Sequence, residues 1–328
     1  MNNRRKLIFA FGASAIAWAS TVRAQAPAKV ARIGLLSPFS RAEFAVLHEA
    51  FRLGLRDLGW VEGKNISIEY RYGEGRLDRL PDLAADLVRL KVDVIVASVT
   101  VDAVAAKNAT KAIPIVMAAA TDPVMSGLVE NLARPAGNVT GLSQMSVQTG
   151  GKRLELLKQM VPKLSRVAVL WDPHAITGTI YWKEIQHPAR QLGIQLHSME
   201  VRSSNDIDKA FEAAARARAD ALFIWPSPVV NTNLKRIADL ALSNRLPSIY
   251  LYPEFADAGG LAAYGADRAD MYRRAATFVD KILKGAKAGD LPIDQATKFE
   301  LVINLKTAKA LGLTIPHSIR LQAERVIE

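Results

Sequence analysis

The pattern that most constrains this chain is a repeated alternation of short apolar runs with amphipathic stretches. Each apolar run has the length of a strand, and each amphipathic stretch has the periodicity of a helix. Strand–helix–strand units of this kind close right-handed into a parallel sheet with helices on both faces. In the first series, strands are predicted at 31–36, 66–72, 92–97, 113–118 and near Val139, with helices at 43–58, up to Leu90 and at 102–110.

A second series begins after a break at 144–151. The same alternation then continues as far as residue 251. It comprises helices at 154–161, 179–192, 206–217 and 231–244, and strands at 166–171, 195–201, 221–225 and 248–251. Because 328 residues exceed one typical core, the two series predict an α/β protein with two Rossmann-like lobes of parallel strands.

The remaining tail is too short for a third domain. It predicts a strand at 261–264, a helix at 271–283 and a strand at 299–303. These elements are best used to return the chain to the first lobe and back, which gives three crossings that form a hinge. The predicted division is 30–146 with 266–290 for the first lobe, and 147–265 with 291–328 for the second.

The N-terminus has the order of a secretory signal peptide. A cationic patch, Arg4–Lys6, precedes the uncharged apolar run Leu7–Trp18, which is shorter than the ~20 residues of a membrane span. Cleavage after Ala24 is preferred, because cleavage after Ala26 leaves Pro27 at the new terminus. Residues 1–24 are therefore predicted to be removed on export to the periplasm, and the paired arginines leave the general and twin-arginine routes open.

Charge and cysteine content exclude several classes of protein. The formal net charge is +11, and the predicted cleavage removes four basic residues and no acid, which leaves +7. The basic residues are scattered among acids, without a basic run interleaved with aromatics, so nucleic acid is not an expected partner. The chain has no cysteine, which excludes disulfides, thiolate catalysis, cysteine-ligated zinc and a cysteine-linked lipid anchor.

The familiar catalytic motifs are incomplete. The glycines at 73 and 75 lack the third glycine of a dinucleotide fingerprint, and 150–153 lacks the Ser or Thr of a phosphate loop. Gly141 and Ser143 do not form a nucleophile elbow, and the histidines share no metal-ligand spacing. Taken with export and two lobes, this favours a binding protein over an enzyme, with no cofactor or metal.

Six segments of the chain carry a recognisable family pattern, at 120–129, 135–141, 166–173, 244–250, 258–265 and 304–316. Together they resemble the ABC transporter substrate-binding family that includes tryptophan- and tyrosine-uptake receptors. The resemblance spans about Ala31 to Glu328 and implies a type I periplasmic binding protein fold and an ABC permease as partner. The chain departs from the family pattern at Asp172, where relatives often carry Asn, and in 260–265, where they often read GLMSYG.

Polar and aromatic residues follow the predicted strands in both lobes. Ligands of open parallel sheets bind beyond the carboxyl ends of the strands, and in a two-lobed receptor those ends face one cleft. Tyr264 joins them at a crossing. The predicted ligand-binding residues are Ser37, Phe39, Ser98, Thr100, Thr121 and Asp122 in the first lobe, and Asp172, His174, Pro226, with Ser227 beside it, and Tyr252 in the second.

The chemistry of this set suits an amino acid, including an aromatic one. Ser98 and Thr100 precede a helix start, where free N–H groups favour a carboxylate. Asp172 or Asp122 can hold an ammonium group, and aromatic rings can close on a planar side chain. Each residue also has a plainer interpretation, since the serines, threonines and Asp122 can be helix caps and Tyr264 can pack in the hinge.

Three functions remain open from the sequence. The first is a monomeric receptor that delivers a small-molecule solute to an ABC importer. The second is a receptor that reports the same ligand to a membrane signalling protein. The third is an exported enzyme built on the same scaffold.

Overall fold

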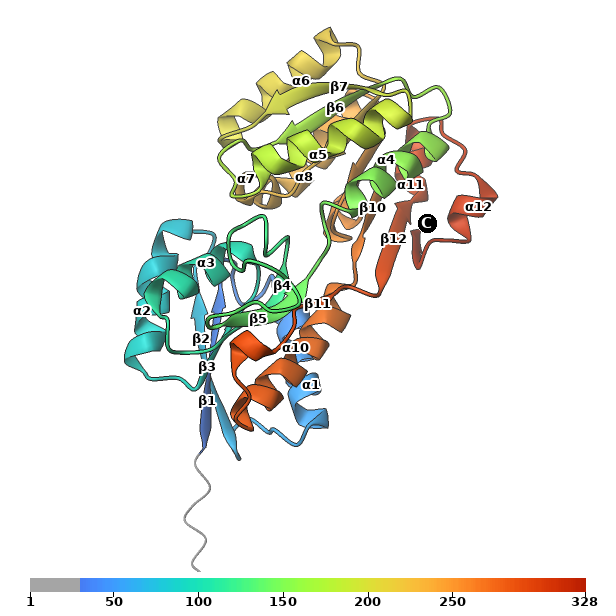
Figure 1. Ribbon diagram of the computed structural model, residues 1–328. Helices are drawn as coiled ribbons and strands as arrows, with labels where there is room; N and C mark the ends of the chain where they lie inside the picture. The colour runs from blue at the N-terminus through green and yellow to red at the C-terminus, as the bar shows by residue number, and fades with distance from the viewer. Residues whose placement is uncertain (1–29) are drawn as a thin grey trace, which may run out of the picture.

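A computed structural model describes residues 30–328, and the predicted signal peptide lies outside these residues. The described chain forms two α/β lobes, one above the other in Figure 1. Connecting segments along one side join them. Two lobes of mostly parallel sheet covered by helices are what the alternating sequence pattern predicted, so that prediction is confirmed.

The sheet of the first lobe has the order β2–β1–β3–β4–β5–β11, and its neighbouring strands are parallel. Apart from Arg32, the central strands are buried along their whole length, because helices cover both faces. The strands are β1 (Ala31–Ser37), β2 (Ile66–Tyr72), β3 (Val94–Ala97), β4 (Ile115–Ala120), β5 (Val139–Ser143) and β11 (Asp294–Gln295).

Helices α1 (Ala45–Asp57) and α10 (Arg268–Leu283) cover one face of this sheet, and they pack closely on each other. Helices α2 (Leu80–Arg89) and α3 (Thr100–Ala109) cover the other. Pro81 lies in the first turn of α2, where its missing N–H costs nothing, as the sequence predicted. Short 3-10 turns occur at Leu77–Arg79 and Ala288–Asp290.

The sheet of the second lobe has the order β7–β6–β8–β9–β10–β12–β13. It is not wholly parallel as expected, because β12 runs antiparallel to β10. The reason is the route of the chain, which leaves this lobe at the end of β10 and re-enters at the same edge. The strands are β6 (Arg166–Trp171), β7 (Gln195–Glu200), β8 (Ala221–Ile224), β9 (Ser248–Tyr250), β10 (Ala262–Ala266), β12 (Phe299–Asn304) and β13 (Arg325–Ile327).

Helices also cover both faces of the second sheet. One apolar core lies between the sheet and α4 (Thr149–Met160) and α5 (Gly178–Gln191). The other lies under α6 (Ile207–Arg216) and α8 (Leu234–Ser243). Shorter helices are α7 (Pro228–Thr232), α9 (Glu254–Asp257), α11 (Leu305–Ala310) and α12 (His317–Arg320), with a 3-10 turn at Ser204–Asp206.

Within residues 30–328 the chain passes between the lobes three times, as the tail pattern predicted. The crossings follow β5, β10 and β11. The second and third are tied together by the Asp267 amide, which donates to the Lys298 carbonyl at 3.0 Å. The expected boundary at 290 and 291 assigned β11 to the second lobe, whereas Asp294–Gln295 pairs with β5 in the first sheet.

His48 lies on the buried face of α1, in a cluster of aromatic rings. Only 5% of its surface is exposed. Its Nδ1 lies 3.2 Å from the Tyr72 hydroxyl, and the rings of Phe44, Tyr70 and Tyr272 pack about it. Burial lowers the pKa of His48 to about 4. The folded protein therefore holds this histidine neutral.

We expect this histidine to make the first lobe sensitive to acid. The unfolded chain has the ordinary pKa of about 6.5 and binds the proton more tightly, so the contribution of His48 is complete above pH 6.5 and is lost as the pH falls toward 4. The free energy of unfolding should fall by about 2 kcal/mol more in the wild type than in His48→Gln between pH 7 and pH 5. Urea denaturation at both pH values measures this, with His187→Gln on the exposed face of α5 as control. Equal pH dependence in wild type and His48→Gln would contradict the expectation.

Candidate functional site

The carboxyl ends of the parallel strands in both sheets lie on the side of each lobe that faces the other. This follows from the crossings, because β5 and β10 each run directly from their carboxyl ends into a segment that enters the opposite lobe. Residues that follow the parallel strands are therefore gathered there. We call this set of strand-end residues the interlobe face.

After β1, the interlobe face carries an aromatic pair. The Phe39 ring stacks on the Phe44 ring with 4.6 Å between centroids and 8° between planes. Ser37 is fully buried beneath them, and its Oγ accepts a hydrogen bond from the Phe39 amide at 3.3 Å. Phe39 thus offers a flat apolar surface, and Ser37 fixes the backbone that presents it.

At the start of α3, a carboxylate of the protein already occupies the amides that were expected to hold a ligand. The Asp102 side chain accepts from the Ser98 amide at 2.6 Å and from the Val99 amide at 2.9 Å. Burial raises the pKa of Asp102 to about 7, although these amide hydrogen bonds lower it. The Ser98 amide is therefore not available to a solute, whereas Thr100 begins the helix and lies beyond this capping contact.

Thr100 also links two strand ends. Its Oγ1 accepts a hydrogen bond from the Thr121 amide, beyond β4, at 2.9 Å. The neighbouring Asp122 uses Oδ1 to accept from the amides of Val124 and Met125 at 3.2 and 2.9 Å. Asp122 therefore stabilises its own turn, which is the plainer of its two sequence interpretations.

In the second lobe, Asp172 has the properties of an unpaired anion. It follows β6 and is 7% exposed, and its Oδ1 accepts from the His174 amide at 2.8 Å. Among residues 30–328, no cationic side chain forms an ion pair with it. His174 contributes this amide, while its side chain belongs to an exposed residue. A buried carboxylate without a cation is costly unless a ligand supplies one.

The other predicted residues of the second lobe differ in their placement. Tyr252 follows β9 and is 9% exposed, and Pro226 is half-buried beside Ser227, whose Oγ caps α7 by accepting from the Val230 amide. Tyr264 lies within β10 and stacks on Phe299 of β12. Its packing is that of a hinge residue, so the structure does not bring it to the strand ends.

Comparison with known proteins identifies the family to which this chain belongs. The profile of the ABC transporter substrate binding protein family matches residues 33–327, nearly the whole described chain. The chain belongs to this family. A tyrosine-binding protein of Clostridioides difficile (strain R20291) is 29% identical over 266 residues, which is 81% of this chain and 76% of that protein.

Solved structures agree with this membership. A conserved domain protein from Vibrio cholerae superposes with a TM-score of 0.85 at 28% identity, over 91% of this chain and 100% of that one. A Streptococcus pneumonia ABC domain in complex with L-Trp gives 0.84 at 27%, over 90% and 99%. A ligand-free, open substrate binding protein from Clostridium difficile gives only 0.71 at 26%, over 91% and 99%. The two lobes are thus arranged more as in the L-Trp complex than as in the open protein. Solute-binding proteins of 13–17% identity share the fold. The substrate-binding protein is therefore a type I periplasmic binding protein in fold, and its family consists of binding proteins rather than enzymes.

Three residues of this substrate-binding protein near the hinge were not predicted. Arg153 on α4 is fully buried, with its guanidinium carbon 4.4 Å from the centre of the Trp225 ring, and burial lowers its pKa to about 10. Gln144 directly follows β5, so the strand-end rule could have included it. Arg268 begins α10 immediately after the second crossing, and no motif marks it.

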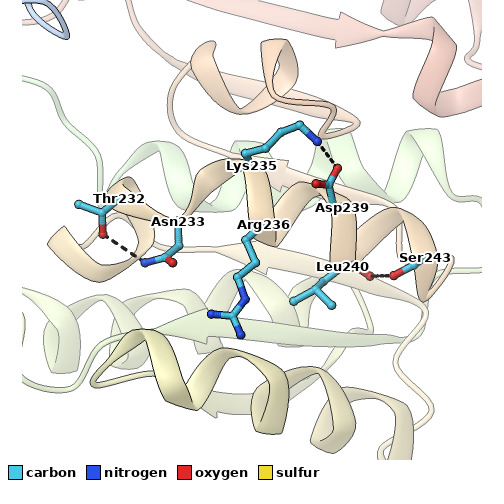
Figure 2. A pocket seen from close by; sticks show the side chains of 7 residues that line it. All are labelled: Thr232, Asn233, Lys235, Arg236, Asp239, Leu240 and Ser243. Atoms are coloured by element: carbon cyan, nitrogen blue, oxygen red, sulfur yellow. Dashed lines mark hydrogen bonds and ion pairs between the residues drawn. The ribbon is translucent and has the colours of Figure 1, made fainter.

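Two surface depressions of the substrate-binding protein contain none of the predicted ligand-binding residues. One, shown in Figure 2, follows the outer side of α8, where Lys235 pairs with Asp239. Arg236, which also lines it, pairs with Asp208 at 2.7 Å. Its charged side chains all have ion-pair partners, as on an ordinary hydrated helix. A second lies between α1 and α10.

Over residues 30–328, no three His, Asp or Glu side chains are grouped as metal ligands. None of the helices in that range has the length and apolarity needed to cross a bilayer.

Proposed function

We propose that this substrate-binding protein receives an aromatic amino acid at the interlobe face and delivers it to an ABC permease. One observation carries the proposal. Asp172 is a nearly buried carboxylate without a cation, and it follows β6 at the strand ends of the lobe in which Tyr252 follows β9, two strands along the same sheet. An α-ammonium group supplies the missing charge through charge-assisted hydrogen bonds. Relatives that bind tyrosine and tryptophan support the same class of solute.

The proposed roles divide the solute between the lobes. Asp172 holds the ammonium group from the second lobe. Thr100, at the start of α3, receives the carboxylate near the helix N-terminus. Phe39 and Tyr252 bracket the aromatic side chain. A solute that contacts both lobes gives the differential free energy that closure requires.

The proposed cellular setting follows from the sequence. The chain is exported, cleaved before Gln25 and held as a monomer in the periplasm. The permease in the inner membrane then receives the closed, loaded form. The solute leaves the protein chemically unchanged.

We expect L-tyrosine or L-tryptophan to raise the melting temperature when the twenty amino acids are tested one at a time. A ligand that binds only the native state adds RT ln(1 + [L]/Kd), about 2.7 kcal/mol at 100 Kd. Isothermal titration then measures Kd, and mass spectrometry of the recovered solute tests for conversion. Stabilisation by none of the amino acids would refute the proposed solute class. Recovery of a converted product would refute the receptor role.

A further inference from the structure

Arg268 bridges the two lobes at the hinge. It is the first residue of α10, which packs on α1 and β4 of the first lobe. Its guanidinium pairs with Glu254 on α9, which packs against β10 and β12 of the second lobe. The side chain of Arg268 is only 11% exposed. This ion pair therefore joins an element of one lobe to an element of the other.

The same guanidinium lies over an aromatic ring of the second lobe. Its central carbon is 4.2 Å from the centre of the Tyr252 ring and 5.9 Å from the centre of the Phe44 ring. Phe44 belongs to the first lobe, where it stacks on Phe39. Arg268 thus lies among aromatic side chains that come from both lobes, and cation–π contacts of this kind strengthen when water is excluded.

Gln144 provides a second tie to the same tyrosine. Its Nε2 donates to the Ala119 carbonyl at the end of β4, at 2.6 Å, and to the Tyr252 hydroxyl at 3.4 Å. Gln144 is buried in the first crossing, and its Oε1 has no partner among the described residues. The ring and the hydroxyl of Tyr252 are therefore held by two different crossing segments.

We propose that Gln144, Tyr252, Glu254 and Arg268 form an interlobe clasp that favours the closed form without solute and fixes the Tyr252 ring for an aromatic side chain. Arg268 and Gln144 are positioning residues, because they act on the solute through Tyr252. Only the second half of this inference rests on the proposed function. The clasp itself concerns the protein without ligand.

The clasp should set affinity as well as shape. When only the closed form binds productively, the apparent Kd equals the intrinsic Kd divided by the closed fraction. A variant that lowers the closed fraction from most of the molecules to about one in ten thus weakens binding about tenfold. Loss of ring placement should add a further penalty for aromatic solutes alone.

The absence of native cysteine allows a direct test. Spin labels at Asp82→Cys on α2 and Lys209→Cys on α6 report the separation of the lobes, because both positions are exposed and Figure 1 places these helices away from the crossings. In the protein without solute, Arg268→Gln should shift the measured distances to longer values. Arg268→Lys, which keeps the charge but loses the planar stack, should give an intermediate shift. Tyr252→Phe, which loses only the Gln144 contact, should give the smallest shift.

The control is Arg273→Gln on the same helix, whose ion pair with Asp57 lies within the first lobe. Its distances should match those of the wild type. If Arg268→Gln does not fold, Arg268→Lys and Tyr252→Phe decide the question. Unchanged distances in the folded clasp variants would overturn the clasp.

Titration with L-tyrosine then tests the coupling. Arg268→Gln should weaken binding about tenfold, in line with its reduced closed fraction. A longer distance with an unchanged Kd would overturn the coupling but leave the clasp. Failure of the wild type to bind any amino acid would overturn the proposed function, and the distance measurements would still decide the clasp.

Discussion

Replacement of Asp172 should cost more solute affinity than any other single change at the interlobe face. In Asp172→Ala the ammonium group of a bound amino acid is left buried without its counter-charge, a loss of about 2–4 kcal/mol, or roughly 30- to 1000-fold in Kd. Asp172→Asn is the sharper variant, because an amide oxygen can still accept from the His174 amide while the negative charge is gone. Calorimetric titration with L-tyrosine and L-tryptophan measures both.

The controls separate charge recognition from general damage. Asp239→Ala removes an exposed carboxylate of the same lobe and should leave Kd unchanged. A solute that lacks the amino group, such as 3-(4-hydroxyphenyl)propionate, should bind Asp172→Asn at least as tightly as the wild type, because the substitution removes an unpaired negative charge. Wild-type affinity for L-tyrosine in a folded Asp172→Asn protein would show that the ammonium group is not held there.

Gly141→Ala should lower the free energy of unfolding of the first lobe far more than alanine substitution of a glycine on the surface of that lobe. Gly141 lies in β5 at φ +127°, opposite Met117 in the register, beside an irregularity in the β4–β5 pairing. A Cβ built there would lie 2.2 Å from the Met117 carbonyl oxygen and 2.5 Å from its amide nitrogen. Backbone strain and a forced shift of two central strands together should cost about 3 kcal/mol or more.

Gly137→Ala is the matched control, because it shares a positive φ of +68° but a Cβ there meets nothing within 4 Å. It should cost only about 1 kcal/mol. Thermal unfolding of the two variants isolates the steric part of the Gly141 effect. Similar melting temperatures would mean that β4 and β5 can move apart at little cost.

Most of the architecture could be predicted from the periodicity of apolar residues, because strands and helices each impose their own spacing on the local sequence. The predicted start of the helix at 154 was late by five residues relative to α4 at Thr149, since Gly150 and Gly151 weaken the helical pattern there. Gly150 is explained by packing, because a Cβ at that position would lie 3.0 Å from Trp225. The direction of β12 and the membership of β11 depend on the path between lobes, which has no local signal.

The sequence was enough to predict which residues of the candidate site lie at strand ends, but not which side chains contact one another there. The strand-end rule gathered residues such as Asp172 and Tyr252, because parallel strands in one sheet end on the same side. It could not foresee that Asp102 takes the amides of Ser98 and Val99, since that depends on a side-chain rotamer. Arg268 was missed for a similar reason, because its contacts with Glu254 and Tyr252 form across the boundary between the lobes and depend on side-chain placement.

The late position of α10 in the chain has a consequence for biosynthesis. Tyr272, Phe278 and Val279 of this helix are buried in the same core as Phe51 and Leu55 of α1. A nascent chain that has emerged only to residue 260 therefore carries the first sheet with one face covered by α1 alone, and the β5 edge of that sheet still lacks β11. The lobe that is translated first is completed nearly last, so the ribosome must release most of the polypeptide before either the sheet or its apolar face is closed to water.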